Sequence, residues 1–325
     1  MARPVGRFAP TPSGYLHLGN LFCSLIAWLA AKSRGGEMIL RNEDLDVERS
    51  RKEYALQAQR DLDALGLFWD QGGDKGGPHS PYDQSQRFDF YRVQLEKLEA
   101  QGRVYPCFCS RAQLHAASAP HASDGELLYN GACRDLTPEQ VAEKSRARSP
   151  ALRLRVPEET IAFTDLHYGP QAQHLPTGCG DFILRRSDGV YAYQLAVVAD
   201  DGAMGVTQVV RGRDLLSSTP RQILLYRLLG YPVPEFGHTP LLLASDGRRL
   251  SKRDGDQSLS GILSRGYSPG TWWGAWPIWG ACCQNPPPPG RRSCFPSFPG
   301  KSCPGRTSPC RRGCSGWDDR DTLCG

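Results

Sequence analysis

The chain has 325 residues, long enough to bury a sizeable core, which excludes a peptide-sized scaffold. Its formal charge of +5 is concentrated at one end: residues 270–325 hold seven Lys or Arg and three Asp, leaving +1 for residues 1–269. Bulk charge is therefore poor evidence for a nucleic-acid-binding protein, and any basic surface must be local.

The N-terminal region favours a cytoplasmic protein. A strand-like run beginning at Arg7 follows Met1 within six residues and leaves no room for the charged and apolar segments of a secretory signal. The longest apolar helical stretch, residues 18–31, is interrupted by Asn20 and Ser24. Because it is too short to cross about 30 Å of hydrocarbon, we expect no membrane segment.

The first part of the chain has the pattern of a βαβ unit. Residues 5–10 predict a buried strand, residues 18–31 predict a helix from their i, i+3, i+4 apolar spacing, and residues 37–41 predict a second strand. Parallel sheets bind ligands at the carboxyl ends of their strands. We therefore expect a nucleotide site near residues 7–20.

Two further helical patterns, residues 48–65 and 88–100, lead into an irregular segment, residues 104–177, that has the composition of an insertion. The alternation of strands and helices then resumes. Strands are expected at 181–186 and 206–211, and helices at 191–199 and 219–229. Thr219 is the expected N-cap of the last helix, with Pro220 as its first residue.

These elements predict an α/β fold in which a Rossmann-like parallel sheet is split by an insertion. The expected divisions are a first catalytic half, the insertion, a second catalytic half, a basic loop with the start of a further region, and an irregular tail. Their boundaries are residues 1–103, 104–177, 178–244, 245–269 and 270–325.

The helix at residues 18–31 begins beside a short polar motif, His17-Leu18-Gly19-Asn20. Unpaired backbone N–H groups at a helix start favour a phosphate, and Gly19 lets a ligand approach the backbone. His17 could then donate to a phosphoryl group. The alternative is that His17 merely caps the helix.

A second motif is basic. Arg249, Leu250, Ser251, Lys252 and Arg253 follow an expected apolar strand at residues 240–244 and a turn at 245–247. Several cations and a hydroxyl on one loop suit a departing pyrophosphate. A solvated surface loop is the alternative.

Five cysteines precede residue 270, and three of them, Cys107, Cys109 and Cys133, are close in sequence. Two thiolates at i and i+2 and a third beyond a 23-residue loop can occupy three corners of a zinc tetrahedron. His115 and His121 lie within the loop as ordinary candidates for the fourth corner. Three unliganded thiols are the alternative.

Together these motifs resemble the class I aminoacyl-tRNA synthetases, and the glutamyl-tRNA synthetase family in particular. The similarity is carried by residues 7–14 (RFAPTPSG), 40–44 (LRNED), 210–214 (VRGRD) and 219–222 (TPRQ), with Tyr193, Asp200 and Asp201. Within that family the chain resembles the shorter glutamyl-queuosine tRNA(Asp) synthetases, from about residue 5 to residue 268.

The resemblance implies an ATP-dependent ligase that forms glutamyl-adenylate and passes the glutamyl group to queuosine at the wobble position of tRNA(Asp). It implies a glutamate pocket of Arg7, Phe8, Ala9, Pro10, Thr11, Glu43, Tyr193 and Arg211. It implies an ATP site of His17, Gly19, Asn20, Arg249, Leu250, Ser251, Lys252 and Arg253, in which His17 and Lys252 are catalytic. Arg211 would fork onto the substrate side-chain carboxylate, and Glu43 would pair with its ammonium group.

The resemblance also implies one structural zinc ion held by Cys107, Cys109, Tyr129 and Cys133, with magnesium accompanying ATP. The expected partners are L-glutamate, ATP and queuosine-containing tRNA(Asp), and the expected state is a monomer. Two alternatives remain open. One is a shortened glutamyl-tRNA synthetase that charges a tRNA 3′ end, and the other is a non-catalytic, zinc-stabilised RNA-binding remnant.

The chain departs from the family pattern in several places. Asn20 stands where a second His is usual, Arg249 replaces a Lys and Leu250 replaces a Met. In residues 270–325, 25 positions are Gly, Pro or Cys and five are Trp, without helix or strand periodicity. Our hypothesis is a frameshift in a GC-rich gene; a disordered basic tail and a cysteine-rich zinc module are the alternatives.

Overall fold

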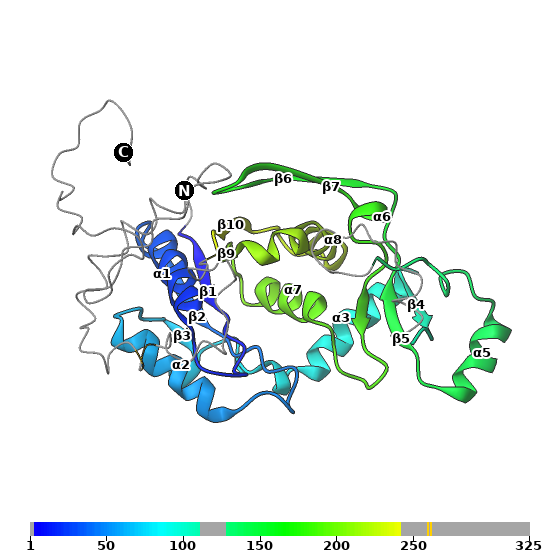
Figure 1. The fold of residues 1–325 in the computed structure, drawn as a ribbon, viewed down its shortest axis with the longest axis horizontal. Helices are drawn as coiled ribbons and strands as arrows, with labels where there is room; N and C mark the ends of the chain where they lie inside the picture. The colour runs from blue at the N-terminus through cyan, green and yellow to red at the C-terminus, as the bar shows by residue number, and fades with distance from the viewer. Residues whose placement is uncertain (1–2, 111–127, 242–258, 260, 262–325) are drawn as a thin grey trace, which may run out of the picture.

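The structure is a computed structural model that describes residues 3–110 and 128–241 together with Leu259 and Gly261 (Figure 1). Several predicted features lie outside the described residues. These are the basic motif Arg249–Arg253, the loop histidines His115 and His121, residues 242–244 of the strand expected at 240–244, and the tail from residue 270.

The N-terminal part forms the predicted strand–helix–strand unit. Strand β1 (Val5–Phe8) pairs in parallel with β2 (Glu37–Leu40), and helix α1 (Leu18–Lys32) connects them. A short strand, β3 (Gln71–Gly72), continues the sheet beyond β2, also in parallel. Apolar spacing in α1 therefore predicted the helix to within one residue of its end.

A second parallel group completes the fold. Strand β10 (Glu235–Thr239) pairs in parallel with both β9 (Gln208–Gly212) and β6 (Thr160–Asp165), and β7 (Gly169–His174) closes the edge antiparallel to β6. The two groups meet between β1 and β9, where Val5 and Thr207 exchange two hydrogen bonds of 2.9 Å. The predicted α/β fold is confirmed.

A separate antiparallel sheet belongs to the inserted region. It has the order β4 (Val104–Cys107), β5 (Ala151–Leu154) and β8 (Ile183–Arg185), with helix α5 (Pro138–Ala147) beside it. Figure 1 places this sheet and α5 at the opposite end of the molecule from β1, β2 and β3.

Two strands pair differently from the sequence prediction. The strand predicted at residues 181–186 does not resume the parallel sheet, because β8 pairs with β5. Conversely, β6 and β7 lie within the predicted insertion, yet β6 extends the catalytic sheet beside β10. The alternation of side chains along a strand predicts which face is buried, but it does not identify the neighbouring strand.

The main helices follow the predicted patterns. They are α2 (Lys52–Ala64), α3 (Phe88–Ala100), α7 (Tyr193–Ala203) and α8 (Thr219–Leu229), with a short α6 (Leu175–Gly178). The described residues also form three 3₁₀ helices: η1 (Gly73–Lys75), η2 (Gln84–Gln86) and η3 (Arg213–Ser218). Thr219 as N-cap was wrong: η3 runs directly into α8, so Ser218 takes that place.

Two apolar clusters hold the catalytic part together. The larger one is built by α3, α7 and α8, with Tyr91, Leu195 and Leu225 fully buried. The other packs α1 against β1 and β2 and includes Leu259 from beyond the described main segments. Each fully buried Leu contributes roughly 2 kcal/mol. No helix in the described part of the chain is both long and apolar enough to span a membrane.

Candidate active site and metal centre

A pocket of about 530 Å³ opens where β1, α1 and β9 meet, at the carboxyl ends of the two central strands. It brings together the described residues predicted for the glutamate and ATP sites. These are Arg7, Phe8, Ala9, Pro10, Thr11, His17, Gly19, Asn20, Glu43, Tyr193 and Arg211. The volume suits a ligand of metabolite size.

Arg7 lies near the end of β1 and is almost fully buried. Its Nε approaches Asp201 Oδ2 at 3.4 Å, and its Nη1 donates to the carbonyl oxygen of Val210 at 3.1 Å. Burial by itself lowers the pKa of the guanidinium, but Asp201, together with Glu43 and Tyr193, outweighs this effect and raises the pKa. Arg7 is therefore a fixed positive charge in the pocket wall.

Arg41 does not line the pocket itself but contacts the pocket residue Glu43. The sequence patterns did not single it out. Its side chain is fully buried and donates to Asp201 at 2.7 Å and to Glu43 at 3.1 Å, with Asp200 at 3.7 Å. Asp200 also accepts from Arg87 at 2.7 Å. Interlocked charges of this kind keep the carboxylate of Glu43 in one place.

Glu43 is the member of that network that lines the pocket, and it is buried. Burial raises the pKa of its carboxyl, although Arg41 and Arg7 oppose the shift. A cation entering the pocket would stabilise the carboxylate of Glu43, which burial has deprived of its hydration. Glu43 can thus receive an ammonium group, which fits its predicted role.

Arg211 lies on β9 and is held by neutral groups. Its Nε donates to His238 Nε2 at 3.0 Å, its Nη1 to Gln222 at 2.7 Å, and its Nη2 to Thr219 at 2.9 Å and to the Leu215 carbonyl oxygen at 3.2 Å. No described carboxylate lies within ion-pair distance of this guanidinium. Burial lowers its pKa, as expected for a desolvated cation.

His17 caps α1, which was the alternative to a role in phosphate binding. Its Nδ1 accepts from the backbone N–H of Gly19 at 3.1 Å, and Asn20 Oδ1 accepts from the backbone N–H of His17 at 3.2 Å. Because Nδ1 is the acceptor, the neutral ring carries its proton on Nε2. Capping and phosphate donation therefore use different ring nitrogens and are compatible.

Several other pocket residues were not predicted from the sequence. Among them are Cys23 and Ser24 on α1, together with Asp214 and Thr239. Helical spacing could have found the first two, since they follow Asn20 at i+3 and i+4. Burial raises the pKa of Cys23 to about 11, so its thiol is uncharged near neutral pH.

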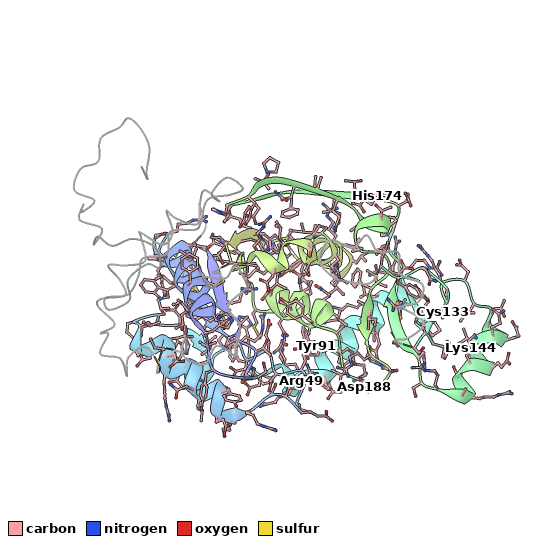
Figure 2. The ribbon with its side chains drawn as sticks, viewed as in Figure 1. Arg49, Tyr91, Cys133, Lys144, His174 and Asp188 are labelled. Carbon is pink, nitrogen blue, oxygen red and sulfur yellow. The ribbon has the colours of Figure 1, made fainter. Side chains whose placement is uncertain are left out.

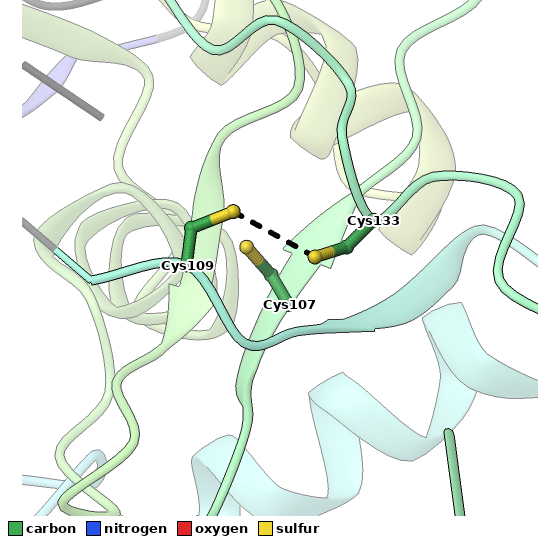
Figure 3. A group of neighbouring side chains, drawn as sticks. All are labelled: Cys107, Cys109 and Cys133. Carbon is green, nitrogen blue, oxygen red and sulfur yellow. Dashed lines mark hydrogen bonds between the residues drawn. The ribbon is translucent and has the colours of Figure 1, made fainter. Parts of the chain in front are cut away.

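The three clustered cysteines form a compact group at the end of β4. Their sulfur atoms all lie within 4.8 Å of one another, and Cys109 Sγ and Cys133 Sγ are 3.7 Å apart (Figure 3). Tyr129 Oη lies 3.5 Å from Cys107 Sγ and 3.9 Å from Cys109 Sγ. The predicted neighbourhood of Cys107, Cys109, Tyr129 and Cys133 is confirmed.

The spacing of these atoms fits a tetrahedral zinc ion. Zn–S bonds of about 2.3 Å and a Zn–O bond of about 2.0 Å would set S···S near ~3.8 Å and S···O near ~3.5 Å. The Arg153 guanidinium stacks on the Tyr129 ring, 3.8 Å from its centre. That positive charge would offset part of the negative charge of the thiolates in a zinc-bound state. The three-cysteine cluster is compatible with zinc.

Comparison with known proteins agrees with this geometry. The chain matches the family described as tRNA synthetases class I (E and Q), catalytic domain, over residues 5–270. It is 59% identical to the glutamyl-Q tRNA(Asp) synthetase of Symbiobacterium thermophilum over 82% of this chain and 83% of that protein. The glutamate–tRNA ligase of the same organism is 44% identical, and the chain spans 55% of its length.

A solved structure shows the same fold. The glutamate tRNA ligase from Elizabethkingia meningosepticum, in complex with its amino acid, superposes with a TM-score of 0.73 at 30% identity. The match covers 85% of this chain and 60% of that one. The chain belongs to the catalytic family of class I glutamyl- and glutaminyl-type tRNA synthetases, and within it to the glutamyl-Q tRNA(Asp) synthetases.

Proposed function

We propose that this protein activates L-glutamate with ATP and transfers the glutamyl group to the queuosine base at the wobble position of tRNA(Asp). The observation that carries the proposal is the pocket in which Arg211, a buried cation without a described carboxylate partner, lies with Glu43, Tyr193 and the helix-capping His17. The 59% identity to a glutamyl-Q tRNA(Asp) synthetase supports the same function.

In the proposed binding mode, the side-chain carboxylate of glutamate lies against Arg211 and its ammonium group against Glu43. Tyr193 lines the same pocket and adds a hydroxyl. Burial, and after it the charge of Glu43, raises the pKa of this phenol, so it stays protonated and can donate a hydrogen bond. Glutamine is rejected because a neutral amide would leave the buried guanidinium without a compensating charge.

The first step is attack of the substrate α-carboxylate on the α-phosphorus of ATP, which releases pyrophosphate. His17, at the start of α1, donates from Nε2 toward the phosphoryl oxygens, and the α1 dipole favours the same negative charge. Lys252 is proposed to stabilise the departing pyrophosphate on the strength of the resemblance, and it lies outside the described residues. Magnesium would share that charge.

The second step transfers the activated glutamyl group to a tRNA hydroxyl, which displaces AMP. Arg7, held by Asp201, keeps its place in the wall of the glutamate pocket during this step. The mixed anhydride reacts directly, so the route needs no covalent bond to the protein. The 59% identity to the glutamyl-Q relative, against 44% to the glutamate–tRNA ligase of the same organism, favours queuosine as the acceptor over a tRNA 3′ end.

The insertion is proposed to carry one structural zinc ion, bound by Cys107, Cys109, Cys133 and the Tyr129 phenol. Zinc would tie β4 to the segment around residues 129–133 and so order the chain on one side of the sheet β4–β5–β8. Basic residues are present in this part, including Lys144 on α5, which Figure 2 shows at the same end of the molecule as Cys133. This part is proposed to face the tRNA.

The test of the whole proposal has two stages. Glutamate-dependent ATP–pyrophosphate exchange without tRNA tests the activation step, with L-glutamine as the matched substrate. Labelled glutamate is then transferred to tRNA(Asp) with and without queuosine, and the label is mapped by nuclease digestion. Label in the anticodon arm supports the proposal, label at the 3′ end supports a shortened glutamyl-tRNA synthetase, and a folded zinc protein without exchange supports the non-catalytic remnant.

A further inference from the structure

Behind Arg211, a hydrogen-bonded chain runs through three neighbouring strands. Arg211 on β9 donates from Nε to His238 Nε2 at 3.0 Å, and His238 on β10 bonds through Nδ1 to Asp165 Oδ2 on β6 at 2.6 Å. All three side chains are at least 96% buried. Neither His238 nor Asp165 lines the pocket, so they act on its contents through Arg211.

The direction of each hydrogen bond follows from elementary chemistry. The guanidinium Nε–H can only donate, so His238 Nε2 has to accept, and the imidazole proton lies on Nδ1. That proton is donated to Asp165 Oδ2. Asp165 Oδ1 in turn accepts from the backbone N–H groups of His167 and Tyr168 at 3.0 and 2.9 Å, which fixes the carboxylate.

Charge supports the same arrangement. Burial, together with the neighbouring Arg211, lowers the pKa of His238 to about 4, so the ring is neutral near pH 7. The pKa of Asp165 is also lowered: burial opposes this, but the hydrogen bond from His238 and those from the backbone prevail. Arg211 is thus held by the neutral ring of His238, and this ring separates it from the carboxylate of Asp165.

We propose that His238 and Asp165 are positioning residues that fix the guanidinium of Arg211 toward the side-chain carboxylate of the amino-acid substrate without neutralising it. This inference rests on the proposed function. A carboxylate in direct contact with Arg211 would form an internal ion pair and compete with the substrate. An imidazole aligned by Asp165 holds the guanidinium equally firmly and leaves its charge available.

Three variants separate the contributions of these two residues. His238→Gln places an amide oxygen near the Nε2 position and keeps an acceptor for Arg211. His238→Asn keeps a donor to Asp165 but leaves Arg211 Nε without an acceptor. Asp165→Asn is nearly isosteric and presents an N–H to His238 Nδ1, so the ring proton moves to Nε2. His238 Nε2 then carries a proton that faces the Arg211 N–H and can no longer accept from it.

The measurements are L-glutamate binding by calorimetry and the KM values for L-glutamate and ATP in pyrophosphate exchange. We expect His238→Asn and Asp165→Asn to weaken glutamate binding and raise its KM by about tenfold to a hundredfold, with KM for ATP unchanged. His238→Gln should stay within about threefold of wild type. Discrimination against L-glutamine should fall in the first two variants.

His174→Gln is the matched control, because His174 also pairs with a carboxylate, Glu158 at 2.9 Å, but lies at the start of α6 (Figure 2) with its side chain 38% exposed. Thermal unfolding monitors folding in every variant. Equal glutamate affinity in wild type, His238→Asn and Asp165→Asn overturns the inference alone, as does a parallel rise in both KM values. A wild-type chain that binds no L-glutamate overturns the inference and the proposed function together.

Discussion

The pocket and the cysteine cluster differ in what holds their residues in place. Around the pocket, Arg7, Arg41 and Arg211 each donate hydrogen bonds to residues distant in sequence, and large apolar clusters pack this part of the fold. The cysteine cluster packs with a small apolar group, whose buried members are Tyr105, Cys107, Phe108, Tyr129 and Cys133. Three of those five are proposed ligands, so we expect this region to depend on a bound metal for its order.

The difference implies that the pocket is preorganised for its ligand before binding, whereas zinc binding at the cysteines is coupled to folding of the insertion. Changing a pocket cation should therefore alter substrate binding with little effect on folding of the insertion. Removing a thiol from the cysteine cluster should disturb folding of the insertion with little effect on substrate binding.

Arg211→Gln removes the proposed partner of the substrate carboxylate while keeping a side chain of similar reach. We expect glutamate-dependent pyrophosphate exchange to fall by about a hundredfold or more, since hydrogen bonds to charged groups contribute about 1.5–3 kcal/mol each. Arg213→Gln, an exposed neighbour stacked on Tyr168, is the matched control. Unchanged KM for L-glutamate in Arg211→Gln would contradict the assignment.

Cys133→Ser tests the metal centre. We expect zinc affinity to fall by about a hundredfold or more and the insertion to become sensitive to proteolysis, because a thiolate ligand is lost and metal binding stabilises the fold. Zinc content per chain and the pattern of limited proteolysis are the measurements. Cys179→Ser, which alters a buried thiol outside the cluster, serves as the control. Zinc retained at wild-type affinity by Cys133→Ser would exclude Cys133 as a ligand.

Acid should destabilise the catalytic part through His238. The pKa of this residue falls from 6.5 to about 4 on folding, so the unfolded chain binds more protons between those values and stability is lost as the pH falls from 6.5 toward 4. Asp165 and Arg211 face the ring from β6 and β9, and Phe236 stacks on it.

At pH 4.5 the loss from His238 is about 2–3 kcal/mol relative to pH 7. Urea unfolding at both pH values, in wild type and in His238→Gln, isolates this contribution from other groups. The pH-dependent fall should be smaller in the variant. Identical falls in the two proteins would show that His238 does not titrate across this range.

Asp135→Asn should have the smallest effect. Asp135 pairs with Arg155 at 3.0 Å on the surface of the insertion, and the Asp135 side chain is 83% exposed. Exposed ion pairs contribute between about 0 and 1 kcal/mol, so the thermal midpoint should move by no more than about 2 °C. A shift as large as that of Cys133→Ser would mean that surface charges, rather than the metal centre, hold the insertion together.

Local patterns in the sequence predicted much of the pocket and its supports. The spacing of apolar residues located α1, α3 and α8 closely, and the family resemblance assigned Arg7, Glu43, Tyr193 and Arg211 to one pocket although they lie far apart in the chain. His238 was not found, because Glu235–Thr239 has a weak strand pattern and its histidine has meaning only beside Arg211. Arg41 was recognised as part of a family motif, without its role.

By itself the sequence determined helices α1, α2, α3, α7 and α8, the central strands β1, β2 and β9, the family, and the types of residue at the two sites, because these follow from periodicity and motifs within short segments. The tertiary structure alone decided that β6 joins the catalytic sheet while β8 joins the insertion, and that Arg211 is held by His238 and Asp165. Pairing between distant strands sets these contacts. Burial then makes them matter, because it removes the water that would otherwise screen each charge.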